Sequence, residues 1–598
     1  MKDINFPDGA IEVVLPVLST ALYNVSNHVC MAQFDGCGNI KEFSKISYGD
    51  VLESGFYYCV IRINGVPLTD QSKAVSMIGR MQQVQIRQND ITVIIKQFLD
   101  DNTSAVFSSY HFLNHGEHDS EISISLGVAC TDHTPLYFYS TPDMNKLEEL
   151  YNKHYYNQLI TVPPGGQREC KYIVSDEELL IKFTFDECFS AGNNSAAGYV
   201  KWLQELNDPI KAVYQSEKIR ALYTSCINCA VSAYKVIPEV GFEAFFAGIS
   251  YQSPARTYFR DGYSTILCLL SIKPEWVKNQ ILTLLRGVNP DGSCPSAVIA
   301  SSDVKPFWDG HYDSPAFMII MVYDYIAETS DFMILDQDIN GCALMTVLEN
   351  CLGWLDRQTD TTGLIVKPGR CRLDWADNVY REGYVTYIQA LYAHATYAMA
   401  AFKRESGDLA TTDTLLSKFR IIKNAINTLL WDDDKGYYIN YVSNDYHEDN
   451  LSLDTVFCVL FGIADDVRSK LHLTACQKLL EVDFGVRCVY PLYKFQEHLV
   501  EKSAFPSRYH NGSDWPYLDG FYALALLKFG FDANHALTRW FDYSLEQGWF
   551  TPVEYYSPDY GKGSFLQAWS STPAYAIQES VVEHIGMMRN NKKESNVK

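Results

Sequence analysis

Two short stretches of this 598-residue chain combine carboxylates with aromatic rings and lie far apart in the sequence: residues 372–378 (RLDWADN) and residues 554–556 (EYY). Cleavage of a glycosidic bond needs one carboxylic acid to protonate the leaving oxygen. A second carboxylate must then activate water or attack the anomeric carbon. We predict Asp377 as the acid, because the indole of Trp375 can shield it from water and raise its pKa. Glu554 is its predicted partner.

Each carboxylate also has a purely structural alternative. Asp377 could be the N-cap of a helix that begins near Asn378. The positive end of that helix would favour the charged carboxylate and oppose a raised pKa, so Asp374 would have to offset it. Glu554 could be a surface carboxylate in a loop. The residue types alone leave these alternatives open.

Further polar and aromatic residues gather in loops just ahead of helical patterns, which is where binding residues concentrate. Arg260 and Asp261 can bind sugar hydroxyls or form a structural ion pair. Arg372 and Asp374 can support the acid or form part of a sugar subsite. The predicted substrate-binding residues are Tyr258, Arg260, Asp261, Trp308, Asp309, His311, Asp374, Trp375, Arg381, His510, Asn511, Trp515, Gln567 and Trp569.

Composition narrows the classes of partner. A formal net charge of -23 disfavours nucleic acid and anionic membranes, which a polyanion repels. The sequence shows no apolar run long enough to span a membrane and no signal peptide. The 16 cysteines are scattered rather than arranged as a disulfide framework, so we predict a cytoplasmic protein with reduced thiols.

Cofactor motifs are missing from the sequence. It has no HExxH, no paired CxxC, no acidic calcium loop and no glycine-rich phosphate loop opening a helix. We therefore predict neither a metal nor a cofactor. The expected partner is a small carbohydrate, and the 14% aromatic content suits rings that stack on sugars. The oligomeric state is left open.

The periodicity of apolar residues changes once along the chain. Residues 1–190 show short β-branched segments, such as 91–98 and 121–128, separated by turn signals, which predicts an antiparallel β-sandwich. Residues 191–216 form a predicted helical linker. From 217 to 598 we expect about a dozen helices, centred near 225, 266, 281, 320, 347, 392, 419, 457, 473, 523, 540 and 572. A mostly α chain of this kind fits a closed double ring, the (α/α)6 barrel.

Four motifs resemble those of one group of enzymes. Residues 259–263 (FRDGY), 374–377 (DWAD), 508–516 (RYHNGSDWP) and Glu554 with 567–570 (QAWS) are similar to elements of the glucosidase domain of glycogen debranching enzymes and its trehalase and processing glucosidase I relatives. The resemblance implies an (α/α)6 barrel with an inverting mechanism, in which Asp377 is the acid and Glu554 the base. It also implies an exo-acting enzyme on an α-glucoside.

Departures from the debranching pattern leave other functions open. The stretch before the acid is Asp-Trp-Ala rather than Asn-Trp-Met, and a transferase domain is missing, so a short oligosaccharide is the expected substrate. The alternatives are an inverting disaccharide phosphorylase on the same fold, a sugar isomerase built on His311 and His510, and a non-catalytic carbohydrate-binding protein. Glu554 argues against the phosphorylase, which needs no base.

Overall fold

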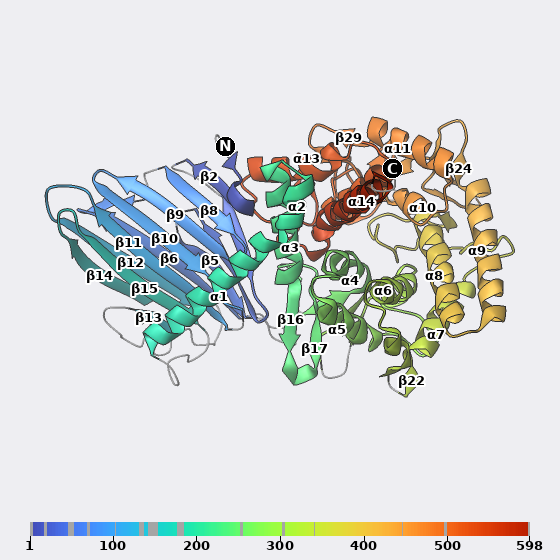
Figure 1. Cartoon of the computed structure of the whole chain (residues 1–598), viewed down its shortest axis with the longest axis horizontal. Coiled ribbons are helices and arrows are strands. Elements are labelled where there is room, and N and C mark those ends of the chain that lie inside the picture. The colour runs from blue at the N-terminus through green and yellow to red at the C-terminus, as the bar shows by residue number, and fades with distance from the viewer. Residues whose placement is uncertain are drawn as a thin grey trace. The chain divides into compact units, whose positions relative to one another are not determined.

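A computed structural model describes residues 4–16, 21–36, 38–45, 53–68, 72–101, 103–130, 137–140, 154–175, 184–251, 255–301, 305–339, 341–444, 446–494 and 499–595. The chain divides into two compact units. Unit 1 comprises residues Met1–Ile237, Ile249–Ala255 and Phe541–Pro552, and unit 2 comprises Pro238–Gly248, Arg256–Trp540 and Val553–Lys598. Figure 1 shows strands gathered in the first unit and helices in the second.

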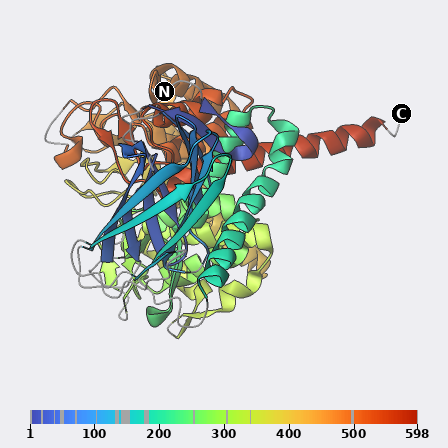
Figure 2. The same cartoon turned by 90° about the vertical axis from the view of Figure 1, so that its left-hand side faces the viewer.

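Two antiparallel sheets build unit 1 (Figures 1 and 2). The eight-stranded sheet has the order β1 (Ile4–Asn5), β2 (Ile11–Leu15), β8 (Lys73–Ile78), β9 (Met81–Gln88), β10 (Ile91–Phe98), β11 (Ala105–Asn114), β15 (Gln167–Ser175) and β13 (Tyr137–Ser140). The seven-stranded sheet has the order β14 (His154–Val162), β12 (Ser120–Cys130), β6 (Glu53–Ile63), β5 (Ile40–Lys45), β4 (Cys30–Asp35) and β3 (Leu22–Ser26), with β7 (Val66–Pro67) paired to β6. The predicted strands at 91–98 and 121–128 are β10 and most of β12.

The two sheets face each other across a buried interior. Apolar side chains alternate along the strands, as in β9, and a buried hydrogen bond joins Tyr172 Oη of one sheet to Gln158 Oε1 of the other at 2.6 Å. On the other face of the first sheet, Phe98 and Phe107 pack against Phe189 of helix α1. The predicted β-sandwich is confirmed.

Three helices follow the sandwich: α1 (Phe185–Leu206), α2 (Asp208–Val213) and α3 (Glu217–Ala233). Thr184 caps α1 in a capping box with Glu187. The predicted domain boundary falls at residue 217, where α3 begins. By packing, however, α3 belongs with unit 1, because Tyr199 of α1 donates to Asn228 of α3 at 2.9 Å inside the buried interface between the two helices.

Helices dominate unit 2, and the apolar periodicity predicted each of them. The helices are α4 (Phe259–Ile266), α5 (Pro274–Leu285), α6 (Ser314–Thr329), α7 (Leu344–Asp356), α8 (Thr386–Glu405), α9 (Leu409–Leu429), α10 (Phe457–Leu460), α11 (Asp466–Leu479), α12 (Pro516–Lys528), α13 (Asn534–Glu546) and α14 (Thr572–Ser595). Of these, α13 is divided between the units, since its residues from Phe541 onward belong to unit 1. Three predicted centres fall at helix ends: residue 266 is the last residue of α4, and residues 457 and 572 are the first residues of α10 and α14.

The even-numbered helices of unit 2 form a closed inner ring. Each contacts the next, in the order α4, α6, α8, α10, α12 and α14, and α14 with its preceding turn η10 (Ala568–Ser571) returns to α4 and η5 (Leu267–Leu269). Helices α5, α7 and α9 pack outside this ring against its members. This is the arrangement of a barrel of paired helices.

Short strands and 3-10 turns lie in the connections before the inner helices. They are β17 (Phe242–Phe245), β18 (Arg256–Tyr258), β19 (Ala297–Ile299), β20 (Lys305–Phe307), β23 (Tyr384–Val385), β24 (Trp431–Asp432), β25 (Tyr437–Tyr438), β26 (Tyr441–Val442), β27 (His447–Glu448), β28 (Leu451–Ser452), η7 (Leu453–Val456), β29 (Glu481–Val482), β30 (Gly485–Val486), β31 (Val489–Tyr490), β32 (Tyr556–Ser557) and β33 (Gly561–Lys562). These connections carry every predicted site residue that does not lie on the first turn of an inner helix. The short pair β21 (Asp338–Ile339) and β22 (Cys342–Ala343) lies instead between α6 and the outer helix α7.

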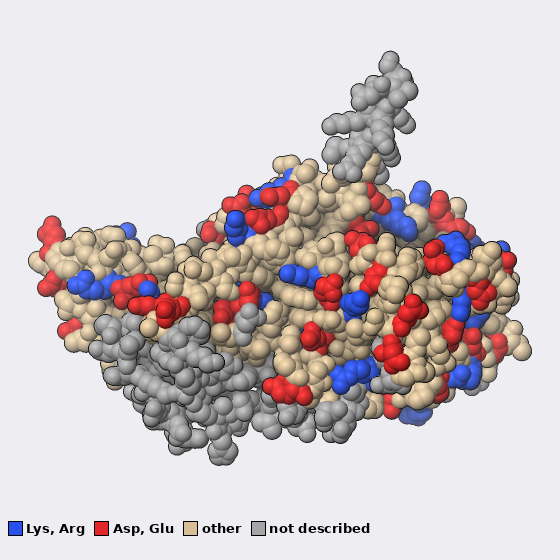
Figure 3. All heavy atoms as spheres, turned by 60° about the horizontal axis from the view of Figure 1, so that its bottom comes forward, with Lys and Arg blue, Asp and Glu red and all other residues tan. Residues whose placement is uncertain are grey.

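Charge on the surface is mixed. Among the described residues on the face shown in Figure 3, basic side chains lie interspersed with acidic ones instead of forming a continuous basic surface. Within the described part of the chain, no helix is long and apolar enough to cross a membrane.

Candidate active site

Asp377 lies in a turn and not at a helix end. Helix α8 begins only at Thr386, and its N-cap is Val385. The expectation that a helix starts near Asn378 is therefore wrong, and with it the N-cap role. The cause is the bridge between Val379 and Leu499, which extends the chain where a helix was expected. The opposition expected from a helix dipole does not arise.

The turn that carries Asp377 is anchored by a buried ion-pair network. Asp374 Oδ1 accepts from the Ala376 amide at 2.8 Å and from Arg381 Nη2 at 2.8 Å, and Lys367 binds its other oxygen. All three charged side chains are fully buried. Burial alone would raise the pKa of Asp374, but Arg381 and Lys367 hold it far below its usual value. Asp374 is thus a fixed anion that shapes the backbone before the acid.

Asp454 of η7 extends this network to the aromatic side chain beside the acid. Its Oδ2 accepts from Arg381 Nη1 at 2.6 Å and from the Trp375 indole nitrogen at 2.5 Å. Trp375 is thereby fixed at both ends, through its backbone beside Asp374 and through its ring nitrogen. Such support orients the groups around a reacting centre.

Asp377 itself is the partly exposed member of this cluster, with 23% of its side chain accessible. Burial raises its pKa, against a hydrogen bond from Asn378 Nδ2 at 2.8 Å and the charges of Arg260, His311 and Lys502. A carboxyl group that has a raised pKa and still reaches solvent has the properties of a general acid.

The predicted residues of the 508–516 motif surround the acid from one side. His510 lies 3.7 Å from Asp377 Oδ1 through Nδ1, and burial holds the pKa of His510 well below its usual value. Its ring stacks on Trp515 with centroids 4.9 Å apart. Asn511 is buried and bonded to the backbone, accepting from the Tyr493 amide at 2.8 Å, so its amide shapes the loop.

A second ion-pair group lies at the start of α4 and α6. Arg260 Nη1 donates to Asp313 Oδ2 at 2.9 Å, and Tyr387 Oη donates to the same oxygen at 3.2 Å. His311 contacts the other oxygen of Asp313 at 3.4 Å. Arg260 and His311 also act on the charge of Asp377, so this group and the acid belong to one site.

Asp261 connects that group to the predicted base. Its Oδ1 accepts from Gln567 Nε2 at 3.3 Å, and Arg260 Nε lies 3.9 Å from its Oδ2. Burial raises the pKa of Asp261 to about 7; Arg260 lowers it and the charge of Glu554 raises it further. Arg260 therefore interacts electrostatically with Asp377, and its neighbour Asp261 interacts electrostatically with Glu554.

Glu554 lies on a β-hairpin, not in an open loop. Strands β32 and β33 pair just after it. The Glu554 amide donates to the Ser564 carbonyl at 2.9 Å, and the Ser564 amide donates to Glu554 Oε2 at 3.1 Å. Gly563 passes so close that a Cβ there would lie 2.4 Å from Glu554 Oε2. The side chain is 5% exposed. The hairpin therefore holds one carboxylate oxygen and fixes its direction.

An aromatic wall runs from Asp377 to Glu554. Trp515 packs edge-on against Trp375 at 5.6 Å and lies 4.9 Å from Tyr555, which follows Glu554. Tyr517 stacks on Trp569 at 4.1 Å. Residues from three distant motifs thus share one wall, as the predicted grouping requires.

The remaining predicted residues lie toward the edge of this group. Trp308 and Asp309 are exposed, and Trp308 packs edge-on against His311 at 5.0 Å. Tyr258 is 9% exposed, and its hydroxyl accepts from Arg256 Nε at 2.7 Å.

Several buried polar atoms of the site have no hydrogen-bond partner among the described residues. They are His311 Nε2, Tyr517 Oη, Trp569 Nε1 and Arg260 Nε. Leaving a buried donor unbonded is costly. Their concentration around Asp377, Asp261 and Glu554 suits a ligand rich in hydroxyl groups.

The structure adds functional candidates that sequence reasoning missed. Asp313 follows His311 by two residues and could have been found as a carboxylate beside a helix start. Lys367 lies in an irregular segment and gave no pattern at all. Gly563 and Tyr517 could not be identified before the fold showed what they approach.

Comparison with known proteins agrees with this geometry. Residues 239–530 match the family described as "Glycosyl hydrolase 94 superfamily, catalytic domain". This span contains Asp377 and ends before Glu554. An N,N'-diacetylchitobiose phosphorylase from Vibrio furnissii is 22% identical over 276 residues, which are 39% of this chain and 34% of the relative. The chain therefore aligns with about a third of that protein's length.

Two solved structures share the fold. A bacterial glucoamylase complexed with acarbose superposes with a TM-score of 0.58 at 13% identity, covering 95% of this chain and 94% of its own. A rhamnosidase from Klebsiella oxytoca with rhamnose bound gives a TM-score of 0.50 at 13% identity, covering 83% and 88%. The predicted β-sandwich and (α/α)6 barrel are confirmed, and the chain is similar to glycoside-processing enzymes with this fold.

Proposed function

We propose that this chain hydrolyses a short oligosaccharide or glycoside, an α-glucoside by the resemblance of its motifs, with inversion at the anomeric carbon. Asp377 gives its proton to the glycosidic oxygen as the bond to the anomeric carbon breaks. Glu554 takes a proton from the water that attacks the opposite face. The observation that carries the proposal is the contrast between Asp377, whose pKa burial raises, and Glu554, whose Oε2 accepts a hydrogen bond from an amide.

The other residues of the site have supporting roles in this proposal. Arg260, His311 and Trp569 bind sugar hydroxyls through buried polar atoms that have no hydrogen-bond partner among the described residues. Gln567 lies beside them through its hydrogen bond to Asp261 at 3.3 Å. Asp374 and Arg381 are buried at 0% exposure and bind each other, which favours a role in positioning the acid. Direct contact of either with the sugar stays a prediction.

Phosphorolysis is the second candidate, because the matched family is named for glycosyl hydrolases while the aligned Vibrio relative is a phosphorylase. Lys562, which interacts electrostatically with Glu554, is the residue that would bind a phosphate. Hydrolysis is favoured because Glu554 and Asp261 already put two carboxylates at the attacking side. A phosphate dianion would be repelled there.

The deciding experiment uses the full chain and a panel of α- and β-linked disaccharides, with and without inorganic phosphate. Hydrolysis predicts sugar release at the same rate in both, and NMR predicts a first-formed anomer of inverted configuration. A sugar 1-phosphate formed only when phosphate is present would reject hydrolysis. A first product of retained configuration would reject the mechanism.

Variants separate the two carboxylates. Asp377→Asn and Glu554→Gln should each lower kcat on a disaccharide by about three orders of magnitude, within the range of general acid–base catalysis. On a nitrophenyl glycoside, whose leaving group needs no proton, kcat should fall much less in Asp377→Asn than in Glu554→Gln. Asp413→Asn, the same change on exposed α9, is the control. Equal losses on both substrates would contradict the assigned roles.

We also propose a reducing, cytoplasmic setting. The buried thiols of Cys268 in η5 and Cys458 on α10 carry no disulfide in the structure. Such thiols suit a compartment that keeps cysteine reduced.

A further inference from the structure

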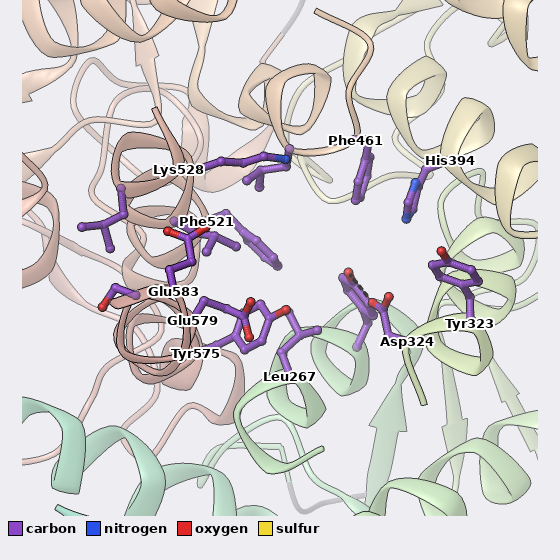
Figure 4. Close-up of a pocket in the computed structure, with 15 residues that line it drawn as sticks. Leu267, Tyr323, Asp324, His394, Phe461, Phe521, Lys528, Tyr575, Glu579 and Glu583 are labelled. Atoms are coloured by element: carbon purple, nitrogen blue, oxygen red, sulfur yellow. Dashed lines mark hydrogen bonds between the residues drawn. The ribbon is translucent and has the colours of Figure 1, made fainter. Parts of the chain in front are cut away.

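A second pocket lies in the barrel, away from the predicted catalytic residues. Its volume is about 370 Å³, and each of the six inner helices or the turn that extends it contributes to its lining. Figure 4 shows the side chains that point into it. The charged and aromatic lining residues are Tyr263, Tyr323, Asp324, His394, Phe461, Phe521, Lys528, Tyr575, Glu579 and Glu583.

A ring of aromatic side chains separates this pocket from the catalytic end. Tyr263, Phe317, Tyr387, Phe457 and Phe521 come from five inner helices, and neighbouring centroids lie 5.1, 6.5, 5.8, 4.8 and 6.3 Å apart around the closed ring. The hydroxyl of Tyr387 points to Asp313 of the catalytic end, whereas that of Tyr263 donates to Asp324 in the pocket at 3.1 Å.

The pocket carries an excess of negative charge. Asp324 of α6 and Glu579 of α14 both face into it (Figure 4), and Glu579 also senses the charges of Glu328 and Glu583. Lys528 lies on the side of Phe461 and His394, and its charge acts on His394. The carboxylates of Asp324 and Glu579 therefore interact with other carboxylates rather than with a cation.

The remaining walls suit an organic body. The rings of Tyr263, Tyr323, Phe521 and Tyr575 line the pocket, and His394 stacks on Phe461 with centroids 4.0 Å apart and planes 1° from parallel. Carboxylates together with aromatic faces recognise ammonium groups, through charge pairing and cation–π attraction. The volume falls within the range of small-molecule sites.

We propose that this pocket binds an organic ammonium ion, with its nitrogen between Asp324 and Glu579 and its hydrocarbon part against the aromatic walls. A neutral sugar would leave both carboxylates without an opposite charge, and an anion would be repelled. The site is independent of the glycoside chemistry proposed for the other end of the barrel.

Proton release accompanies binding in this proposal. Burial and the charge of Glu579 raise the pKa of Asp324 to about 7, against the hydrogen bond from Tyr263. A bound cation favours the ionised carboxylate, so the affinity should rise between about pH 6 and pH 8. The groups that face Asp324 are Tyr263 of α4, Tyr323 and Glu328 of α6, His394 of α8, Lys528 of α12, and Tyr575, Glu579 and Glu583 of α14.

The test is calorimetric titration of the full chain at about pH 8 with 2-phenylethylammonium and with 2-phenylethanol as the neutral probe of the same shape. The ammonium probe should bind at least about tenfold more tightly. Asp324→Asn and Glu579→Gln, on different helices, should each weaken it about tenfold, roughly the effect of one lost charge pair. Asp413→Asn on exposed α9 should leave the affinity unchanged.

Amines can also enter glycosidase sites, so the titration is repeated on the Asp377→Asn, Glu554→Gln double variant. Retained binding there, together with loss in Asp324→Asn and Glu579→Gln, supports the second pocket. The proposal is overturned if the alcohol binds as well as the amine. It is equally overturned if the amine fails to saturate, or if the double variant loses binding while both pocket variants keep it.

Discussion

At the end of the barrel where the inner helices begin, buried carboxylates meet cations. Asp374 binds Lys367 and Arg381, and Asp313 binds Arg260 at 2.9 Å. At the opposite end of the same helices, Asp324 meets Glu579 across an open pocket. The first end is internally neutralised and therefore rigid before any ligand arrives, while the second is left with charge that only a ligand can oppose.

Removing a cation from the neutralised end should produce the largest effect. Arg381→Met leaves Asp374 and Asp454 buried without their shared partner, and breaking such a network costs about 3–5 kcal/mol. Chemical unfolding should show this loss. Turnover of a disaccharide should fall as well, since Asp374 and Trp375 lose their support.

Arg420→Met on the exposed face of α9 is the matched control and should change the free energy of unfolding by less than about 0.5 kcal/mol. If Arg381→Met behaved like this control, the ion pairs would not be what fixes the catalytic end.

Gly563→Ala tests how closely the same end is packed. A Cβ at Gly563 would lie 2.4 Å from Glu554 Oε2 and 2.7 Å from the Tyr555 ring, so the carboxylate must move. A displacement of that size should lower kcat by about a hundredfold. Gly561→Ala, in the same hairpin with open space around it, separates this contact from a general effect on the turn, although its φ of 77° adds backbone strain. Equal kcat values for the two variants would contradict the close contact.

How far the sequence predicts each end depends on the range of the interactions involved. Helix positions follow from local periodicity, which is why the inner and outer helices were all found, although three predicted centres fall at helix ends. The hairpin of Glu554 was not predicted from the sequence, because β32 and β33 are only two residues each and pair only in the folded chain. Lys367 was missed although its partner Asp374 is only seven residues away, because the irregular segment between them shows no periodicity that would pair the two side chains.

The opposite end did leave a local signal. Asp324 interrupts the apolar run of α6, between Met321-Val322 and Tyr325-Ile326, and an acidic residue there requires an explanation. The sequence could not supply it, because Tyr263 and Glu579 come from helices more than fifty residues away on either side. The sequence around a buried charged residue is enough to identify it as unusual, but it does not identify the residue that the charge interacts with.

Neutralising the opposite end should be mildly stabilising, unlike the loss of Arg381. The folded-state pKa of Asp324, about 7, lies above its usual value of 3.8, so the folded chain holds a proton that the unfolded chain has released. Wild type therefore loses stability as the pH rises from about 4 to about 7. Linkage alone would make Asp324→Asn about 4 kcal/mol more stable than wild type at pH 8. Because Asp324 is only partly buried and solvent screens its charge, we expect at least about 1 kcal/mol, with the difference vanishing near pH 4.

Measuring the free energy of unfolding at several pH values tests whether Asp324→Asn is more stable or less stable than wild type. The Asp413→Asn control, on an exposed side chain, should follow wild type throughout. A variant that is less stable than wild type at pH 8 would mean that Asp324 is satisfied without a ligand, and the contrast between the two ends would fail.

The smallest expected effect concerns the pH dependence of turnover. Asp377 acts as an acid only while protonated, so activity should fall as the pH rises through its pKa. The charge of Lys502 lowers that pKa, and removing it in Lys502→Gln should shift the alkaline limb of kcat/KM to higher pH by a few tenths of a unit. Because Lys502 is exposed, the shift should shrink in about 1 M salt, where the Debye length is about 3 Å. Lys470→Gln on exposed α11 should leave the limb in place, and a shift to lower pH in Lys502→Gln would remove Asp377 as the group that the alkaline limb reports.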